Sequence, residues 1–289
     1  MNRFKTLVVT LISLLIAYDA MAVGTQYYQA KMVQSRWQFE GSPIRCVLKH
    51  EIPRYGEARF VHLSGGELGF FMSVKQPPVR NGVAIMLSAP AMWKPGEEEQ
   101  PLGQLALSRG DTPFYSSRDM ALRLMYELEA GRFPTVHYRD WADNRNDVYV
   151  RLSAVRYREA TLDFETCIAQ LLPYGFDDLH GMNILFDTDS HQLTENARAQ
   201  LEKLLDYLPH DKEIKRITIS GHADSRASHS HNDVLSMNRA YSIGDYLVAS
   251  GLLPEQIKID YFGKRRPIKD NRTPSGLQAN RRVEIRLIK

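Results

Sequence analysis

The hydrophobic pattern of this sequence changes near Pro173-Tyr174-Gly175, and that change determines the kind of fold to expect. Before it, apolar and polar residues alternate over short stretches such as 148–152, which is typical of β-strands. After it, strand-like runs alternate with helical patterns of period 3.6. With 289 residues, and roughly 100–200 residues per domain, the chain has room for two domains.

The first part, residues 23–178, is predicted to be β-rich. Residues 59–63 and 68–74 indicate a hairpin, with Ser64-Gly65-Gly66-Glu67 as its turn. Residues 94–101 are predicted to be a loop. Two helices interrupt the strands. One follows Ser116, which with Asp119 resembles a capping box, and the other covers residues 158–172.

The second part, residues 179–289, is predicted to be a sandwich of two helices on one mixed sheet. Strands are expected at 184–186, 217–220, 257–262 and 283–287, and helices over 194–208 and from Ser236 to Gly251. This gives the order β-α-β-α-β-β. The fold class of the whole chain is therefore predicted to be α+β.

Residues 1–22 have the pattern of a cleaved signal peptide. Arg3 and Lys5 precede an apolar run from Leu7 to Ala17, and Ala20-Met21-Ala22 supplies a cleavage site. The run is shorter than the ~20 residues that a transmembrane helix needs, although an uncleaved anchor is the alternative. No cysteine follows the cleavage site, which argues against a lipoprotein. The mature chain is expected to be exported and soluble.

Export affects what is expected of Cys46 and Cys167, the two cysteines of the chain. In an oxidising compartment they are expected to pair, and two buried free thiols are the alternative. A bridge across 121 residues would stabilise the fold by on the order of 4–5 kcal/mol in the loop-closure model. It would hold the helix at 158–172 against the strand region around Cys46.

The charge balance argues against one class of function. The chain has 37 basic and 34 acidic residues, a net charge of +3. A general nucleic-acid binder usually carries a stronger basic excess. We therefore expect no nucleic-acid partner.

Asp224 and Arg239 are the candidate ligand-binding residues. Asp224 follows a predicted strand within Gly221-His222-Ala223-Asp224, and Arg239 is expected one turn into the next helix. A carboxylate and a guanidinium held apart match a ligand that carries both an ammonium and a carboxylate. The alternative is an internal salt bridge that only fixes the loop.

Residues 183–288 resemble the OmpA-like peptidoglycan-binding family. Its pattern G-H-[TA]-D, N-x-x-L-S-x-x-R-A and N-R-R-V is matched by residues 221–224, 232–240 and 280–283. The resemblance implies that Asp224 takes the ammonium, and Arg239 the carboxylate, of diaminopimelate in the cell-wall stem peptide. It also implies that the same pocket is lined by Phe186, Asp187, Ala223, Asn232 and Leu235.

Several of these positions keep a second interpretation. Leu235 could belong only to the core, and Asn232 could only cap the helix. Ala227 stands where the family often has glycine. If the loop needs a positive φ there, alanine would cost about 1 kcal/mol and the loop would differ from that of the family.

The whole chain also resembles a family of secreted proteins of the sodium-driven flagellar motor. The grounds are the signal peptide, a β-rich domain with a cysteine near each end, the segment from Phe164 to Pro173, and a terminal wall-binding domain. The resemblance implies a periplasmic protein of the T ring around the basal body, near the outer membrane. It also implies that residues 23–178 engage the basal body and a MotX-like partner, and that the protein helps stator units assemble.

Three rival interpretations remain open from the sequence. The chain could be a different wall-anchored periplasmic adaptor, unrelated to motility. His222, His229 and His231 could bind zinc in a wall hydrolase, but no HExxH signature occurs, so we expect no metal, no cofactor and no enzymatic activity. Finally, Trp37, Trp93 and Trp141 could form a sugar-stacking platform, with packing in the core or an interface as the alternative.

Overall fold

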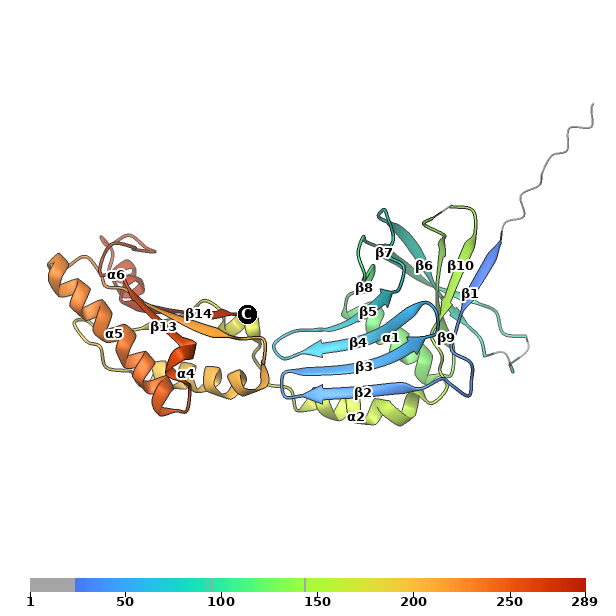
Figure 1. The fold of residues 1–289 in the computed structure, drawn as a ribbon, viewed down its shortest axis with the longest axis horizontal. Helices are drawn as coiled ribbons and strands as arrows, with labels where there is room; N and C mark the ends of the chain where they lie inside the picture. The colour runs from blue at the N-terminus through green and yellow to red at the C-terminus, as the bar shows by residue number, and fades with distance from the viewer. Residues whose placement is uncertain (1–23, 92, 95, 143) are drawn as a thin grey trace, which may run out of the picture.

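The computed structural model describes residues 24–91, 93–94, 96–142 and 144–289. The expected signal peptide, residues 1–22, lies outside the described residues. The described residues form two lobes, each with its own β-sheet and its own hydrophobic core (Figure 1). Among them, no helix is both long enough and apolar enough to cross a membrane.

The first lobe is built on a ten-stranded sheet in the order β1-β10-β9-β6-β7-β8-β5-β4-β3-β2. Neighbouring strands are antiparallel except β1 and β10, which are parallel. The strands are β1 (Thr25–Tyr28), β2 (Trp37–Ser42), β3 (Arg45–Ile52), β4 (Gly56–Leu63), β5 (Leu68–Val74), β6 (Gly82–Ala89), β7 (Gln100–Leu107), β8 (Phe114–Ser116), β9 (Phe133–Arg139) and β10 (Asp147–Arg151).

This sheet curls so that its two edges approach each other. The indole Nε1 of Trp37, on the edge strand β2, donates a hydrogen bond of 2.8 Å to the carbonyl of Ser153, just beyond β10. Helix α1 (Arg118–Glu129) packs against β5 and β9, and helix α2 (Tyr157–Ala169) packs against β2 and β3. The curled sheet and its helices therefore enclose one core.

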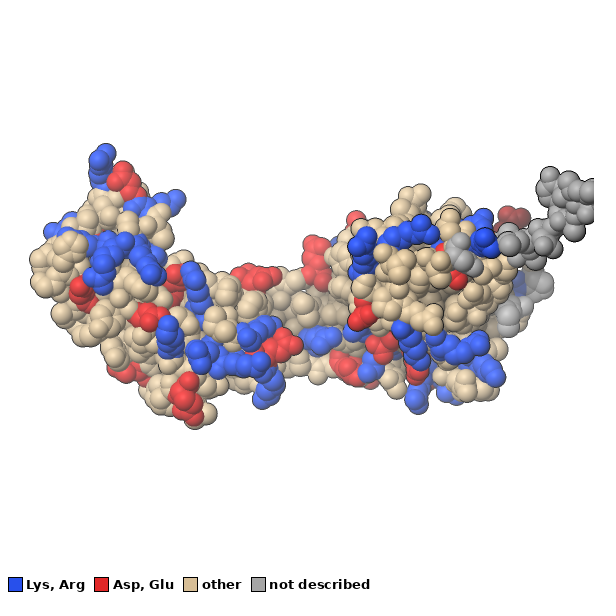
Figure 2. Space-filling view, turned by 45° about the horizontal axis from the view of Figure 1, so that its top comes forward, with Lys and Arg blue, Asp and Glu red and all other residues tan. Residues whose placement is uncertain are grey.

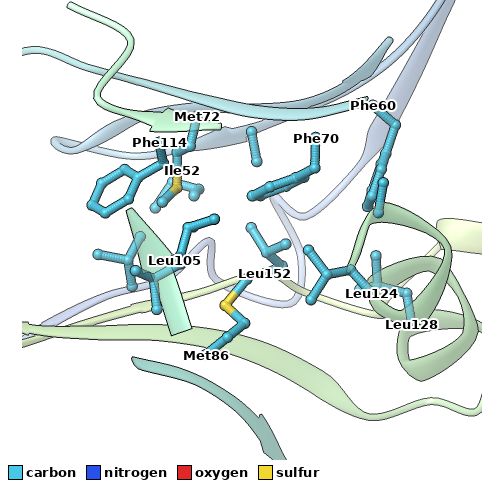
Figure 3. Close-up of a cluster of buried hydrophobic side chains, with 14 of the residues drawn as sticks. Ile52, Phe60, Phe70, Met72, Met86, Leu105, Phe114, Leu124, Leu128 and Leu152 are labelled. Carbon is cyan, nitrogen blue, oxygen red and sulfur yellow. The ribbon is translucent and has the colours of Figure 1, made fainter. Parts of the chain in front are cut away.

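That core collects side chains from almost every strand of the first lobe (Figure 3). Phe60, Phe70 and Phe114 come from β4, β5 and β8 and are fully buried, and α1 adds Leu124 and Leu128. Burying one such side chain contributes about 1.5–3 kcal/mol. The alternation of apolar and polar residues along the strands is what directs one face of the sheet inward.

Part of the predicted first lobe is confirmed. β4 and β5 form the expected hairpin. The expected capping box at Ser116 is wrong, because Ser116 is the last residue of β8 and pairs with Phe70. Ser117 occupies the N-cap position of α1, and its side chain makes no capping hydrogen bond. The second helix ends at Ala169, so Leu172 lies beyond it and packs against the core of the second lobe.

The structure joins Cys46 of β3 and Cys167 of α2 by a disulfide, with 6.0 Å between their Cα atoms. Cys46 is fully buried. The bond fastens α2 to the strand that it covers, as the sequence predicted.

The second lobe has a mixed four-stranded sheet in the order β11-β14-β12-β13, and the predicted sandwich and α+β class are confirmed. Its core lies between this sheet and the two long helices. The elements are α3 (Phe176–Leu179), β11 (Met182–Leu185), α4 (Glu195–Tyr207), η1 (Leu208–His210), β12 (Arg216–Gly221), α5 (His229–Ala249), η2 (Pro254–Gln256), β13 (Ile257–Tyr261), α6 (Pro274–Asn280) and β14 (Arg282–Ile288).

The start of α5 differs from the prediction. Ser228, not Ser236, is its N-cap and accepts a 3.2 Å hydrogen bond from the backbone N–H of His231. Ser236 lies in the middle of the helix, buried, and its hydroxyl accepts from the backbone N–H of Gly263. Residues 229–233 are all polar, so no apolar helical period marks the first turn of α5 in the sequence. Arg239 therefore lies about three turns into α5 rather than one.

Candidate ligand-binding site

A pocket of ≈310 Å³ opens between three parts of the second lobe. These are the segment after β11, the loop from β12 to α5, and the first half of α5. Gly221, at the end of β12, lets this loop begin close against α5, because a Cβ there would lie 2.0 Å from the carbonyl oxygen of Ser236. Of the expected binding residues, Asp224, Asn232, Leu235 and Arg239 line this pocket.

Asp224 presents a carboxylate that is already paired. Its Oδ2 accepts hydrogen bonds from Arg226 Nε at 3.0 Å and Nη2 at 2.8 Å, and from Arg281 Nη1 at 3.1 Å. Burial alone would raise the pKa of Asp224. The hydrogen bonds from the side chain and backbone of Arg226 and from Arg281 outweigh it and lower that pKa. Asp224 is therefore ionised at neutral pH.

Arg239 is fully buried and held by backbone carbonyls. It donates to the carbonyls of Ser190, His222 and Asp187 at 2.8, 3.1 and 2.9 Å. Its guanidinium carbon lies 5.4 Å from the ring centroid of Phe186. A guanidinium has five N–H donors, so two remain for a ligand.

The electrostatics around Arg239 favour an anion. Burial, and then the nearby charge of Arg281, lower the pKa of Arg239 to about 10, which still leaves it positive at neutral pH. Arg226, Arg239 and Arg281 line the pocket beside two carboxylates, Asp224 and Asp189. A ligand that brings a carboxylate to Arg239 would therefore reduce the repulsion among the arginines.

Asp224 and Arg239 do not form the internal salt bridge that the sequence left open. The ion pairs of Asp224 are with Arg226 and Arg281. Arg239 is anchored by carbonyls instead, and both residues line the same pocket.

The other expected binding residues have supporting positions. Phe186 is buried beneath Arg239, and its carbonyl accepts from Arg281 Nε at 3.3 Å. Asp187 contributes its carbonyl to Arg239. Ala223 is buried and donates its N–H to Gly263. These three residues shape the site without lining the pocket.

A hydrogen bond joins Asn232 to Ala227 in the loop between β12 and α5. Asn232 lies inside α5, where its side-chain amide donates to the carbonyl of Ala227 at 3.1 Å, so it is not the helix cap. Lys264 Nζ donates to the same carbonyl at 2.8 Å. Ala227 is not among the residues with positive φ, so alanine is unstrained at this position.

Sequence reasoning missed several residues that line the pocket, namely Arg226, Arg281, Thr188, Asp189 and His231. Arg281 was within the quoted motif at 280–283, which was the available signal. Asp189 adopts φ +54 and its carboxylate lies 2.6 Å from His231 Nε2, at the mouth of the pocket. The left-handed backbone conformation of Asp189 does not alter the spacing of apolar residues, so the sequence pattern could not reveal it.

The three histidines considered for zinc do not converge. His222 is buried against the Phe262 ring, whereas His231 pairs with Asp189 and His229 is exposed. Within the described part of the chain, no group of three or more His, Cys, Asp and Glu side chains is placed to hold a metal ion.

Two protein families match different parts of the chain. The MotY N-terminal domain family matches residues 28–173, and the OmpA family matches residues 185–281. The peptidoglycan-associated lipoprotein of Pseudomonas aeruginosa is 31% identical over 105 residues, covering 35% of this chain and 59% of that protein. The crystal structure of the Burkholderia pseudomallei lipoprotein of that name aligns with 36% of this chain and 88% of its own, at 25% identity and a TM-score of 0.35.

One relative matches almost end to end. The sodium-type flagellar protein MotY of Vibrio parahaemolyticus is 32% identical over 290 aligned residues, which cover 99% of this chain and 98% of that protein. The resemblance inferred from the sequence is confirmed on both halves. The chain therefore belongs to the MotY family of sodium-type flagellar proteins.

Proposed function

We propose that this chain is a non-enzymatic periplasmic component of the flagellar motor that anchors to peptidoglycan through diaminopimelate. The observation that carries the proposal is that Asp224 and Arg239, held by different elements, line one pocket. Residues 179–289 would form the wall-binding domain, and residues 23–178 the domain that associates with the motor. Support comes from the match to the OmpA family and from the name of the Pseudomonas aeruginosa relative.

Diaminopimelate carries an ammonium and a carboxylate on one carbon, and the pocket offers a complement to each. The two remaining donors of Arg239 suit a carboxylate, which accepts paired N–H groups. Asp224 suits the ammonium, but only after Arg226 leaves it. Arg226 is half-exposed, whereas Arg281 is buried, so a ligand would displace Arg226 rather than Arg281.

We further propose, from membership of the MotY family, that the protein lies in the T ring around the basal body, near the outer membrane. There residues 23–178 would contact the basal body and a MotX-like partner and would help stator units assemble. A tagged chain in flagellated cells should then localise to the flagellar base. A diffuse envelope signal would favour the rival interpretation of a wall adaptor unrelated to motility.

Wall binding is tested with Asp224→Ala, Arg239→Ala and Arg239→Lys. Each alanine variant should weaken binding to purified sacculi by about 2 kcal/mol, roughly thirtyfold, because one side of a desolvated charged contact is removed. Lysine should rescue only in part, since an ammonium lacks the planar fork. Arg265→Ala is the control for loss of a positive charge elsewhere in this lobe, because Arg265 pairs with Asp233 outside the pocket. It should leave sacculus binding unchanged. Unchanged binding with a lowered melting temperature would assign Asp224 and Arg239 a structural role only.

Arg226→Ala tests the displacement step. Removing Arg226 leaves Arg281 as the side-chain donor to Asp224 Oδ2. Binding of a diaminopimelate-containing muropeptide should then tighten by up to about fivefold, since an exposed ion pair contributes about 1 kcal/mol or less. Isothermal titration measures this difference. Equal binding by Arg226→Ala and the unmodified chain would show that Arg226 does not compete for Asp224.

A further inference from the structure

The first lobe contains a pocket of its own, of ≈280 Å³, between the β1–β10 edge of the sheet and the turn from β3 to β4. Four aromatic residues line it: Tyr28, Tyr55, Tyr138 and Trp141. They come from β1, the β3–β4 turn, β9 and the segment after β9. Its volume is at the small end of the range for ligand pockets, about 300–1,000 Å³, and is suited to a single ring.

The aromatic lining is held rigidly. The rings of Tyr138 and Trp141 are parallel, with centroids 4.6 Å apart, and those of Tyr28 and Tyr55 are 5.0 Å apart. The Tyr138 hydroxyl donates to the Tyr55 hydroxyl at 3.1 Å. Burial raises the pKa of both hydroxyls, so both stay neutral. Tyr55 and Tyr138 are buried and hold the lining in place, whereas Tyr28 and Trp141 are partly exposed.

Arg54 adopts a backbone conformation that glycine favours and arginine does not. The N–H of Tyr55 donates to the carbonyl of Ile52 at 3.0 Å, which closes a turn with Pro53 second and Arg54 third. Arg54 has φ +70, and the third position of such a turn is usually glycine. A side chain there costs about 1 kcal/mol.

The side chain of Arg54 has no role within the fold that would offset this strain. It is exposed, lines the pocket, and forms no hydrogen bond or ion pair with any described residue. Backbone strain of this kind concentrates at binding sites. The free guanidinium therefore points to a ligand.

Asp140 supplies the opposite charge. Its Oδ1 accepts from the backbone N–H of Ala142 at 2.9 Å, and its Oδ2 accepts from the Gln26 amide at 3.4 Å. One arginine and one aspartate leave the lining without net charge, so the lining does not favour an anion or a cation, and both side chains offer hydrogen bonds to a polar ligand. Planar guanidinium, carboxylate and amide groups can each engage two neighbouring hydroxyls.

We propose that this pocket binds one pyranose ring of a neutral glycan. The C–H face of the sugar would lie against the partly exposed rings of Tyr28 and Trp141, and adjacent hydroxyls would bond to Arg54 and Asp140. The proposal does not depend on the diaminopimelate site, because the pocket would bind a glycan chain that carries no peptide.

The test is calorimetric titration of the full chain with chitotriose, a soluble glycan that lacks diaminopimelate. Arg54→Gly removes the guanidinium and also relieves the strained φ, so the variant should melt at the same temperature or higher. Its affinity for chitotriose should fall at least tenfold. Trp141→Ala should weaken binding comparably, whereas Asp224→Ala should leave it unchanged.

Arg156→Gly is the matched control. Arg156 also has a positive φ, +59, at the N-cap of α2, but it does not line the pocket. It should gain the same stability as Arg54→Gly and keep full chitotriose binding. No saturable binding of chitotriose, or equal binding by Arg54→Gly and Arg156→Gly, would overturn the proposal.

Discussion

At the scale of single residues, His222 links the stability of the second lobe to pH. It is 3% exposed, and its ring stacks on Phe262 with centroids 5.4 Å apart. Burial, and then the charge of Arg282, lower the pKa of His222 to about 4. Neither ring nitrogen has a hydrogen-bond partner among the described residues, so nothing there favours its charged form.

We expect the free energy of unfolding to fall as the pH is lowered from 6.5 to 4. The unfolded chain takes up a proton at its ordinary pKa of about 6.5, whereas folded His222 remains neutral until about pH 4. The contribution lost is on the order of 3 kcal/mol. Urea denaturation at pH 7 and 4.5 should show a smaller difference for His222→Gln than for the exposed control His229→Gln. Equal differences would contradict this assignment.

The sequence motif pointed to Asp224 and Arg239, which line the candidate pocket, but not to the partners of Asp224. Asp224 and Arg239 were recognisable because a strand end and a helix bring motif residues together. Arg226 was not, because an arginine two residues beyond an aspartate is ordinary in a solvated loop. Its role comes from the return of its guanidinium onto Asp224, which depends on side-chain rotamers that no spacing encodes.

At the scale of elements, the start of α5 decides which side chains face the pocket. With Ser228 as N-cap, His231, Leu235 and Arg239 follow at intervals of four and share one helix face. The expected start at Ser236 would have left His231 and Asn232 in a loop with no fixed geometry. The cap therefore positions half of the pocket.

Ser228→Ala should destabilise the second lobe by about 1 kcal/mol, the usual effect of removing an N-cap hydroxyl. The reason is that the His231 N–H loses its acceptor. Chemical denaturation measures the change. Ser225→Ala, an exposed serine in the same loop, is the control and should have no effect. If both variants unfold alike, the hydroxyl of Ser228 does not determine where α5 begins.

Elements with interrupted patterns were the hardest to predict. Residues 94–101 read as a loop ending at Pro101, yet β7 begins at Gln100 and includes Pro101. Proline fits there because it lies opposite Leu87, where the register of β6 and β7 shifts in a bulge. Regular elements such as the β4–β5 hairpin, α4 and β12 were predictable because one face of each is uniformly apolar.

At the scale of the whole molecule, both lobes mix both signs of charge. Figure 2 shows Lys and Arg side chains interspersed with Asp and Glu across the visible face. With a net charge of only +3, a general electrostatic attraction to the wall would be weak. On the two proposals made above, affinity and specificity for the wall would come from pockets with placed groups, such as those at Arg239 and Arg54.

The disulfide should stabilise the first lobe alone. It closes a loop of 121 residues that spans β3 to α2, so reducing it should lower the free energy of unfolding by on the order of 4–5 kcal/mol. Denaturation with and without dithiothreitol measures this change without creating a cavity at the buried Cys46. A Cys46→Ser, Cys167→Ser double variant should show no response to the reductant. The pocket at Asp224 lies in the second lobe, which has a separate core, so folded protein should still bind the muropeptide after reduction. Thiol labelling of the denatured, unreduced chain decides the premise, because two reactive thiols there would mean that no bridge exists.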